Sequence, residues 1–345
     1  MKTVYVGLSG GVDSAVSAYL LKRQGYNVVG AFIKVWEPDF MPCTAQQDRL
    51  DAMRVAAHLE IPFKTYDLEE EYKRGVVDYF LDEYKAGRTP NPDVACNREV
   101  KFGAFWDVAK KDGADCIATG HYAQKKLIDG ANALIRGVDE GKDQSYFLWT
   151  LTQDDLAHSL FPVGELPKSE VRSIAASINL PNARKKDSQG LCFLGHVDMQ
   201  EFLQHYIPVK KGPVRLMDGT VLGEHDGVWF HTIGQRLSLA HGARLYIVAK
   251  NVKNNELIVA EEYTPKEYAR ATWTLRDCNW IRNVPRDGTS VEAEIRYHGT
   301  PHNASITGDQ ITFEEPLLVA PGQSIVCYHP ETGECTGGGI VAGYV

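Results

Sequence analysis

The chain has 345 residues, of which 43% are hydrophobic and 24% are charged, the composition of an ordinary globular protein. No apolar run approaches the roughly 18 residues of a membrane-spanning helix. The first strand-like run begins almost at once, so we expect a cytoplasmic protein without a leader segment or membrane contact. Seven cysteines without any CxxC pair argue against a disulfide scaffold and a structural zinc site.

The net charge of −8 argues by itself against a nucleic-acid partner. The charge is unevenly distributed, however, because residues 184–253 carry ten basic and six acidic side chains. Two interpretations fit this excess: a basic strip that contacts RNA, and an ordinary solvated face.

The first half of the chain alternates strand-like and helix-like segments. Strands are expected at 4–8, 28–35, 62–68 and 115–120, and helices at 14–24, 46–59, 70–85 and 100–111. In the second helix we expect Leu50, Met53 and Ala57 to form the apolar face. The alternation predicts an α/β fold of Rossmann-like type, a parallel sheet with helices on both faces. Ligands bind such sheets beyond the carboxyl ends of the strands.

The pattern changes after about residue 197. One helical stretch remains, at 199–206, and it is followed by short alternating runs with hairpin signals at Asp218-Gly219 and Asn254-Asn255. Residues 271–345 predict a small antiparallel β-barrel. We therefore expect an α/β domain at 1–197, a small mixed central domain at 198–268 and a C-terminal barrel domain at 269–345.

A strand, a glycine turn and a helix meet at the stretch SGGVDS, Ser9 to Ser14. Adjacent glycines let backbone N–H groups face an anion, and the following helix adds its positive end. The stretch lacks the lysine of GxxxxGK[ST] and the spacing of GxGxxG. It resembles the PP-loop of the ATP pyrophosphatases, which implies that ATP binds here and that its β- and γ-phosphates leave as pyrophosphate. Mg²⁺ is expected with the ATP, with no ligands assigned.

Two cysteines lie in polar stretches rather than in apolar periodic runs. Cys96 belongs to RTPNPDVACNREVKF, with Arg98 and Lys101 close by, and Cys192 belongs to KKDSQGLCFLG. Nearby positive charge and partial exposure favour a reactive thiolate, so each is a candidate reactive thiol or an ordinary loop cysteine. The other cysteines read as core, sheet or turn residues without a role: Cys116, Cys278 and Cys327 in core or sheet, Cys43 and Cys335 in turn-rich stretches.

Seven blocks appear in order along the chain: GLSGGVDS, RTPNPDVACN, IATGHYA, KDQSYFL, KKDSQGLCFLG, TIGQR and PGQS. Nearly end to end they resemble the MnmA/TrmU family of tRNA-specific 2-thiouridylases. The resemblance implies that sulfur replaces O2 of the wobble uridine after ATP has adenylated that oxygen. It further implies that Cys192 carries the sulfur as a persulfide, that Cys96 releases it by forming a Cys96–Cys192 disulfide, and that Asp93 is the general acid/base. Attack by the persulfide itself and attack by released hydrosulfide stay open.

The resemblance also assigns binding residues and partners. The residues expected to line the ATP site are Gly7, Leu8, Ser9, Gly10, Gly11, Val12, Asp13, Ser14, Ile33 and Gly120. The residues expected to contact tRNA are Asn91, Pro92 and Asp93 at the target base, and His121, Lys142, Asp143, Gln144, Arg296, Tyr297 and Gln323 elsewhere. A sulfur-relay carrier protein or a cysteine desulfurase would load Cys192, and we expect a monomer. The sequence departs from the family after TIGQR, where Leu237-Ser238-Leu239 stands in place of a basic residue and glycine.

Two other classes of function fit parts of the sequence. An ATP-dependent ligase with the same loop would join nitrogen to an activated carbonyl, and substitution of its cysteines would have little effect. A non-catalytic RNA-binding module would be expected to carry a degraded loop, whereas SGGVDS is intact.

Overall fold

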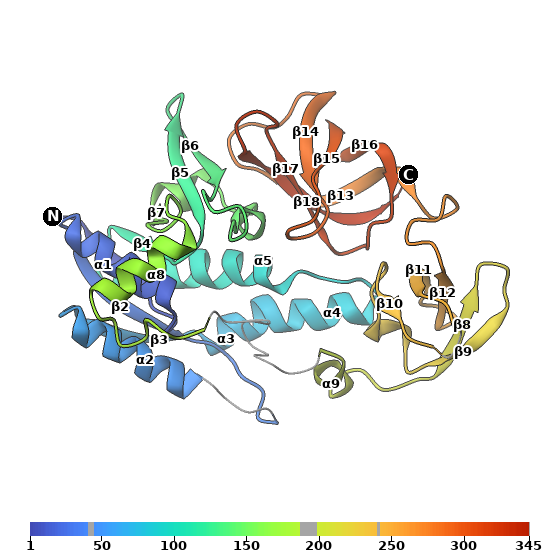
Figure 1. Ribbon diagram of the computed structural model, residues 1–345, viewed down its shortest axis with the longest axis horizontal. Helices are drawn as coiled ribbons and strands as arrows, with labels where there is room; N and C mark the ends of the chain where they lie inside the picture. The colour runs from blue at the N-terminus through green and yellow to red at the C-terminus, as the bar shows by residue number, and fades with distance from the viewer. Residues whose placement is uncertain (41–44, 187–198, 240–241, 345) are drawn as a thin grey trace.

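The computed structural model describes residues 1–40, 45–186, 199–239 and 242–344 (Figure 1). Cys43, Cys192 and most of the KKDSQGLCFLG block lie outside these residues. The described chain forms three sheets: a parallel sheet near the N-terminus, a mixed central sheet and a C-terminal barrel. Within the described ranges, no helix combines the length and the apolar character that crossing a membrane requires.

The N-terminal sheet has five strands in the order β3-β2-β1-β4-β7, and all its pairings are parallel. The strands are β1 (Thr3–Gly7), β2 (Asn27–Lys34), β3 (Phe63–Asp67), β4 (Cys116–Ala118) and β7 (Ser159–Leu160). Successive residues of β1 enter different cores, since Val4 and Val6 pack with α1 (Val12–Arg23) and α2 (Ala45–His58), whereas Tyr5 packs on the opposite face. The predicted doubly covered parallel sheet is confirmed.

The face of α2 was predicted wrongly. Leu50 and Met53 are each 38% exposed, and the residues that α2 buries are Ala52, Val55 and Ala56. A Cβ on Gly30 of β2 would lie 3.6 Å from the Cβ of Ala56, so this face of α2 packs on the sheet in ordinary van der Waals contact. Leu50 and Met53 point outward.

Two long helical runs cover the other face. The first consists of α3 (Glu69–Tyr72), the π-helical η1 (Lys73–Asp78) and α4 (Tyr79–Lys85). The second consists of α5 (Pro92–Cys96), the π-helical η2 (Asn97–Ala104) and α6 (Phe105–Lys111). The second run begins eight residues earlier than the predicted residue 100, because Asn91 caps it and Pro92 occupies its first position. The remaining helical elements are η3 (Ser145–Leu148), α7 (Gln153–Ala157), α8 (Lys168–Ser177) and α9 (Met199–Gln204).

The central sheet has the order β10-β11-β12-β8-β9 and is mixed, since β12 and β8 pair in parallel. Its elements are β8 (Gly212–Leu216), β9 (Val221–His225), η4 (Val228–Phe230), β10 (Arg236–Leu237), β11 (Leu245–Asn251) and β12 (Glu256–Ala260). Both predicted hairpins are present, because β8 pairs with β9 and β11 with β12 in antiparallel fashion.

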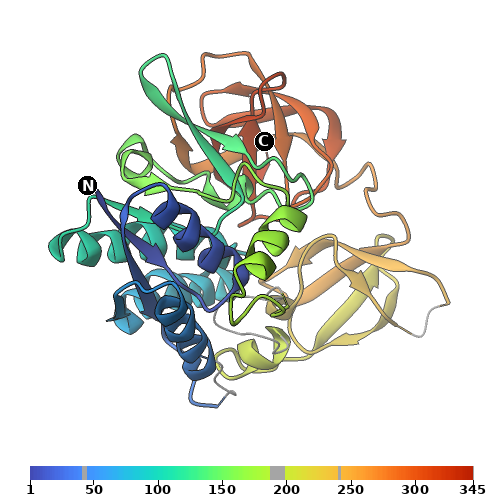
Figure 2. The same ribbon diagram turned by 60° about the vertical axis from the view of Figure 1, so that its left-hand side comes forward.

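The C-terminal strands close into a barrel, since β13 pairs with both β16 and β18. The barrel strands are β13 (Arg270–Trp280), β14 (Thr289–Glu294), β15 (His302–Thr307), β16 (Gln310–Leu317), β17 (Ser324–Tyr328) and β18 (Glu334–Tyr344). A hairpin from the N-terminal half, β5 (Ala123–Ile128) and β6 (Ala131–Arg136), adds to this sheet through β18 (Figures 1 and 2). The barrel was predicted, but this hairpin was not.

Candidate active site

The SGGVDS stretch connects β1 to α1 at the carboxyl edge of the parallel sheet. Gly10 has φ +78°, and a Cβ there would lie 2.6 Å from the carbonyl oxygen of Asp48. Only glycine fits this conformation and this close contact without strain. Asn182 donates from Nδ2 to the carbonyl oxygens of Gly10 and Gly11, over 2.9 and 3.0 Å. These carbonyls are therefore held toward Asn182.

The end of β4 closes the other side of the loop. A Cβ on Gly120 would lie 2.7 Å from the backbone nitrogen of Ser14, so only glycine allows this approach to the first turn of α1. The hydroxyl of Tyr122 donates to Oδ1 of Asp13 over 2.8 Å. Ile33 lies near the end of β2 and is half-buried. Gly7 to Ser14, Ile33 and Gly120, the predicted ATP residues, thus share one edge of the sheet.

Lys168 of α8 also contacts this loop, and it was not among the residues predicted from the sequence. It begins α8 and donates from Nζ to both carboxylate oxygens of Asp13, over 2.6 and 2.8 Å. The loop lacks a lysine of its own, and the fold supplies one from elsewhere in the chain. Its position directly after Pro167, at the start of a predictable helix, was the only signal in the sequence.

Asp93 and Cys96 lie one helical turn apart on α5. The Asn91 side chain accepts from the backbone N–H groups of Asp93 and Val94, over 3.2 and 3.3 Å, and so fixes the start of the helix. Cys96 is buried. Both residues thus lie on a single capped helix, and their chemical roles stay predictions.

Burial raises the pKa of Asp93, and the positive charge of Lys101 partly offsets the rise. Burial also lowers the pKa of His121 well below its usual value, and Lys101 lowers it further. His121 is therefore a neutral imidazole at physiological pH, and its Nδ1 lies 2.8 Å from the hydroxyl of Thr119. Because Lys101 influences both groups, Asp93 and His121 share one electrostatic environment.

The segment Gly120–Tyr122 connects the anion loop to the α5 helical run. Gly120 and Tyr122 contact the loop, as described above. His121, between them, has its ring centroid 5.9 Å from that of Phe102 in η2. The loop and η2, which continues from the helix that carries Cys96, are therefore linked through three consecutive residues.

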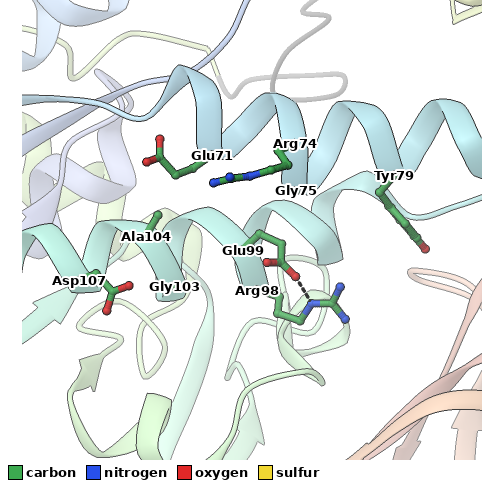
Figure 3. Close-up of a pocket in the computed structure, with 9 residues that line it drawn as sticks. All are labelled: Glu71, Arg74, Gly75, Tyr79, Arg98, Glu99, Gly103, Ala104 and Asp107. Atoms are coloured by element: carbon green, nitrogen blue, oxygen red, sulfur yellow. Dashed lines mark hydrogen bonds and ion pairs between the residues drawn. The ribbon is translucent and has the colours of Figure 1, made fainter.

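Arg98 is one of the two cations expected near Cys96. It forms an ion pair with Glu99 over 2.6 Å, in a cleft of about 550 Å³ between the two helical runs (Figure 3). Gly75 lies directly over the Glu99 side chain there, since a Cβ on Gly75 would be 2.8 Å from the Glu99 Cβ. Lys101, the other expected cation, acts on the pKa of Asp93.

The predicted tRNA contacts Lys142, Asp143 and Gln144 lie in a tight segment before η3. Asp143 is buried and accepts from the backbone of Gly137 and from the backbone and hydroxyl of Ser145. Gln144 bonds the backbone N–H of Tyr122 over 3.1 Å. These contacts give Asp143 and Gln144 structural roles, and contact with RNA stays a prediction.

Arg296, Tyr297 and Gln323 come from the barrel. Arg296 is exposed, and the ring of Tyr297 packs 4.3 Å from Phe147 and 3.9 Å from His298, between ring centroids. Gln323 donates from Nε2 to the carbonyls of Thr89 and Pro90, over 2.8 and 3.4 Å. The barrel therefore borders the Asn91–Asp93 segment, although the two are far apart in sequence.

The other described cysteines lie in strands. Cys116, Cys327 and Cys335 are buried, whereas Cys278 in β13 is exposed. Cys335 was expected in a turn, but it pairs with Leu134 of β6 inside β18. Across the described part of the chain, no group of three or more His, Cys, Asp or Glu side chains could hold a metal ion.

Comparison with known proteins agrees with this organisation. Family models match three ranges: "tRNA methyl transferase HUP domain" at 2–196, "tRNA methyl transferase PRC-barrel domain" at 200–261 and "Aminomethyltransferase beta-barrel domain" at 270–341. The chain is 45% identical to the "tRNA-specific 2-thiouridylase MnmA" of Proteus mirabilis, over 99% of this chain and 97% of that protein. It is 46% identical to the protein of the same name from Nitrosomonas europaea, over 99% and 98%.

The chain belongs to the tRNA-specific 2-thiouridylase family. The resemblance stated from the seven blocks is thus confirmed over the whole length. A solved structure of a "U34-tRNA thiolase NcsA" from Methanococcus maripaludis is 21% identical, covers 60% of this chain and 67% of its own, and superposes with a TM-score of 0.37. That similarity is too low to bear on the site. Within the 2-thiouridylase family, the division of this chain at 197/198 and 268/269 stays a prediction.

Proposed function

We propose that the protein is an ATP-dependent tRNA-uridine 2-sulfurtransferase that forms 2-thiouridine at the wobble position. The observation that supports this most is the link between the anion loop and the helical run that begins with α5, made by Gly120 and Tyr122 at the loop and by His121 at Phe102 of η2. A loop that holds pyrophosphate beside a helix with a carboxylic acid and a thiol suits activation of an oxygen followed by attack by sulfur. Full-length membership of the 2-thiouridylase family supports the same reaction.

The chemistry needs two stages because an amide-like carbonyl oxygen is a poor leaving group. In the first, O2 of the uridine attacks the α-phosphate of ATP and pyrophosphate leaves. In the second, a sulfur nucleophile attacks C2 and AMP departs with the oxygen. The uridine must be swung out of the anticodon loop to be reached, which costs less in a single-stranded loop than in a duplex.

Cys192 would bring the sulfur as a persulfide, and Cys96 would complete the electron balance. Attack of the Cys96 thiolate on the inner sulfur of the persulfide forms the Cys96–Cys192 disulfide and releases the outer sulfur, either as hydrosulfide or already bonded to C2. A thiol reductant then restores both cysteines. Asp93, whose pKa is raised by burial, is suited to hold or accept a proton at the target base.

The loop residues fit the phosphates of ATP. Gly10 and Gly120 let the loop pack closely against the backbone of Asp48 and Ser14, and α1 presents its N-terminus. We propose Gly7 to Ser14, Ile33 and Gly120 as the nucleotide site, with Lys168 added, and Mg²⁺ accompanying the nucleotide. At the tRNA we propose Asn91, Pro92 and Asp93 at the target base, and His121, Lys142, Asp143, Gln144, Arg296 and Tyr297 elsewhere.

The proposal also covers the location of the protein, its oligomeric state, its sulfur source and its domains. The protein would act in the cytoplasm as a monomer and receive sulfur from a relay carrier protein or a cysteine desulfurase. We propose three domains: a catalytic domain at 1–197, a central domain at 198–268 and a barrel domain at 269–345.

Nucleoside mass spectrometry tests the proposal. Unmodified tRNA is incubated with the protein, ATP and a sulfide or persulfide source, and the digest is searched for 2-thiouridine. A 2-thiouridine peak that requires ATP supports the function. Absence of the peak with every donor, together with pyrophosphate release only when an amine or small acid is added, would instead identify a ligase.

A further inference from the structure

The segment that connects α4 to α5, residues 86–91, is held from three directions. It leads directly into Asn91, whose side chain caps the helix of Asp93 and Cys96. In Figure 1 the connection lies where the barrel and the central sheet come together beside the ends of the two helical runs. Any shift of this segment would move the cap and the first turn of α5.

The barrel holds the segment through its β16–β17 loop. The backbone N–H of Thr89 donates to the carbonyl of Pro321 over 2.8 Å. Gly322 packs so closely that a Cβ on it would lie 2.9 Å from both the nitrogen and the oxygen of Thr89. The Gln323 amide then donates to the carbonyls of Thr89 and Pro90. Both backbone groups of Thr89 thus find their partners on the barrel.

The central domain holds the same residue from another side. The hydroxyl of Thr89 donates to the hydroxyl of Thr232 over 3.1 Å. Gly87 has φ +78°, and a Cβ on it would overlap the side chain of Val252. The central domain therefore requires glycine at this turn and adds a side-chain hydrogen bond to Thr89.

A buried carboxylate completes the arrangement. Glu83 of α4 accepts two hydrogen bonds from the Arg88 guanidinium, over 2.6 and 2.8 Å. It also accepts from Arg276 of β13 over 2.7 Å. Two cations from different parts of the chain therefore converge on one carboxylate, which fixes the position of Arg88 relative to the barrel.

We propose that Gln323 is a positioning residue, which locks the Thr89–Pro90 backbone and through it the Asn91 cap, so that Asp93 and Cys96 are aligned for sulfur transfer. This inference deepens the proposed function and rests on it for the reaction. It assigns Gln323 a role inside the protein, whereas the sequence resemblance assigns it a contact with tRNA. The two roles predict different results. A positioning role lowers the rate and leaves the tRNA affinity unchanged, whereas an RNA contact lowers the affinity and leaves the saturated rate unchanged.

The test compares Gln323→Ala, Gln323→Glu and Gln323→Lys with the wild type. The Glu variant keeps the shape but turns an acceptor toward two carbonyl oxygens, whereas the Lys variant keeps a donor. Gln310→Ala, on β16 of the same barrel, is the matched control. Three quantities are measured: the single-turnover rate of 2-thiouridine formation at saturating ATP and tRNA, the tRNA dissociation constant, and amide hydrogen exchange at Asp93 and Val94.

We expect the single-turnover rate of the Ala and Glu variants to fall about tenfold, and amide exchange at Asp93 and Val94 to become about tenfold faster. Changes of this size correspond to the loss of one or two neutral hydrogen bonds. The tRNA dissociation constant stays within about twofold of wild type. The Lys variant recovers most of the rate and of the protection, and Gln310→Ala leaves all three quantities unchanged.

A weaker tRNA affinity with unchanged saturated rate and exchange would overturn the proposal and make Gln323 an RNA contact. No change in any quantity would also overturn it. If the wild type forms no 2-thiouridine, the reaction is wrong, but hydrogen exchange still decides whether Gln323 holds the cap. If the Ala variant does not fold, the Glu and Lys variants, which differ in donor capacity, decide the question.

Discussion

Lys168 and Asp13 form an ion pair at the anion loop, with Nζ 2.6 Å from one carboxylate oxygen and 2.8 Å from the other. They are 155 residues apart in the chain. The Lys168 side chain is only 13% exposed, so the pair is largely shielded from solvent. The pair therefore brings a cation to a loop that has no lysine of its own.

We expect Lys168→Met to reduce ATP-dependent pyrophosphate release by about 10- to 100-fold at low ATP, because charge-assisted hydrogen bonds contribute about 1.5–3 kcal/mol. Pyrophosphate release is measured over a range of ATP concentrations. Lys64→Met is the matched control, since Lys64 forms its ion pair with Asp112, away from the loop. Equal effects of the two substitutions would rule out a specific role for Lys168.

Gly10→Ala should abolish ATP binding and destabilise the fold. The new Cβ would lie 2.6 Å from the Asp48 carbonyl oxygen, and alanine disfavours φ +78° by about 1–2 kcal/mol. Gly25→Ala is the control, because Gly25 has φ +86° with open space around its Cβ position. Urea unfolding measures the stability of each variant, and ATP titration measures its ATP binding. Gly25→Ala should show the conformational cost alone and normal ATP binding.

Cys96→Ser and Cys192→Ser should each abolish 2-thiouridine formation while pyrophosphate release in the presence of tRNA persists. The reason is that activation of O2 needs the loop, and sulfur transfer needs both thiols. Cys278 is exposed on β13, and Cys278→Ser should behave like the wild type. Parallel mass spectrometry and pyrophosphate assays make the comparison, and retained thiolation by either active-site variant would contradict the assigned roles.

Asp93→Asn should stabilise the fold increasingly as the pH rises. Burial raises the pKa of Asp93 in the folded protein above its unfolded value, so the native state binds the proton more tightly. Stability in the wild type is therefore lost as the pH rises through the folded pKa, and the neutral amide avoids this loss. Urea midpoints of wild type and variant are compared between pH 5 and 8. A difference that shrinks with rising pH would contradict the buried-carboxylate assignment.

The sequence predicted some elements of the structure because their signals are local. The alternation of β1 to β4 with helices, the two central hairpins and the barrel follow from periodicity and turn residues close in the chain. The early start of α5 was also encoded locally, in Asn91 and Pro92, although the helix was expected to begin at residue 100. The outward face of α2 was not predictable in this way, because the helix carries apolar residues on two faces and only its packing on the sheet decides which of them is buried.

The sequence by itself determined the α/β class, the anion loop, the family and the candidate residues Asp93, Cys96 and Cys192. Only the tertiary structure decided which distant residues join them: Lys168 at the loop, the β5–β6 hairpin on the barrel sheet, and Gln323 on the Thr89 backbone. The physical reason is that periodicity and capping depend on neighbours within a few residues. Ion pairs, strand pairings and backbone contacts between distant segments depend on how the domains pack, and no local pattern encodes that.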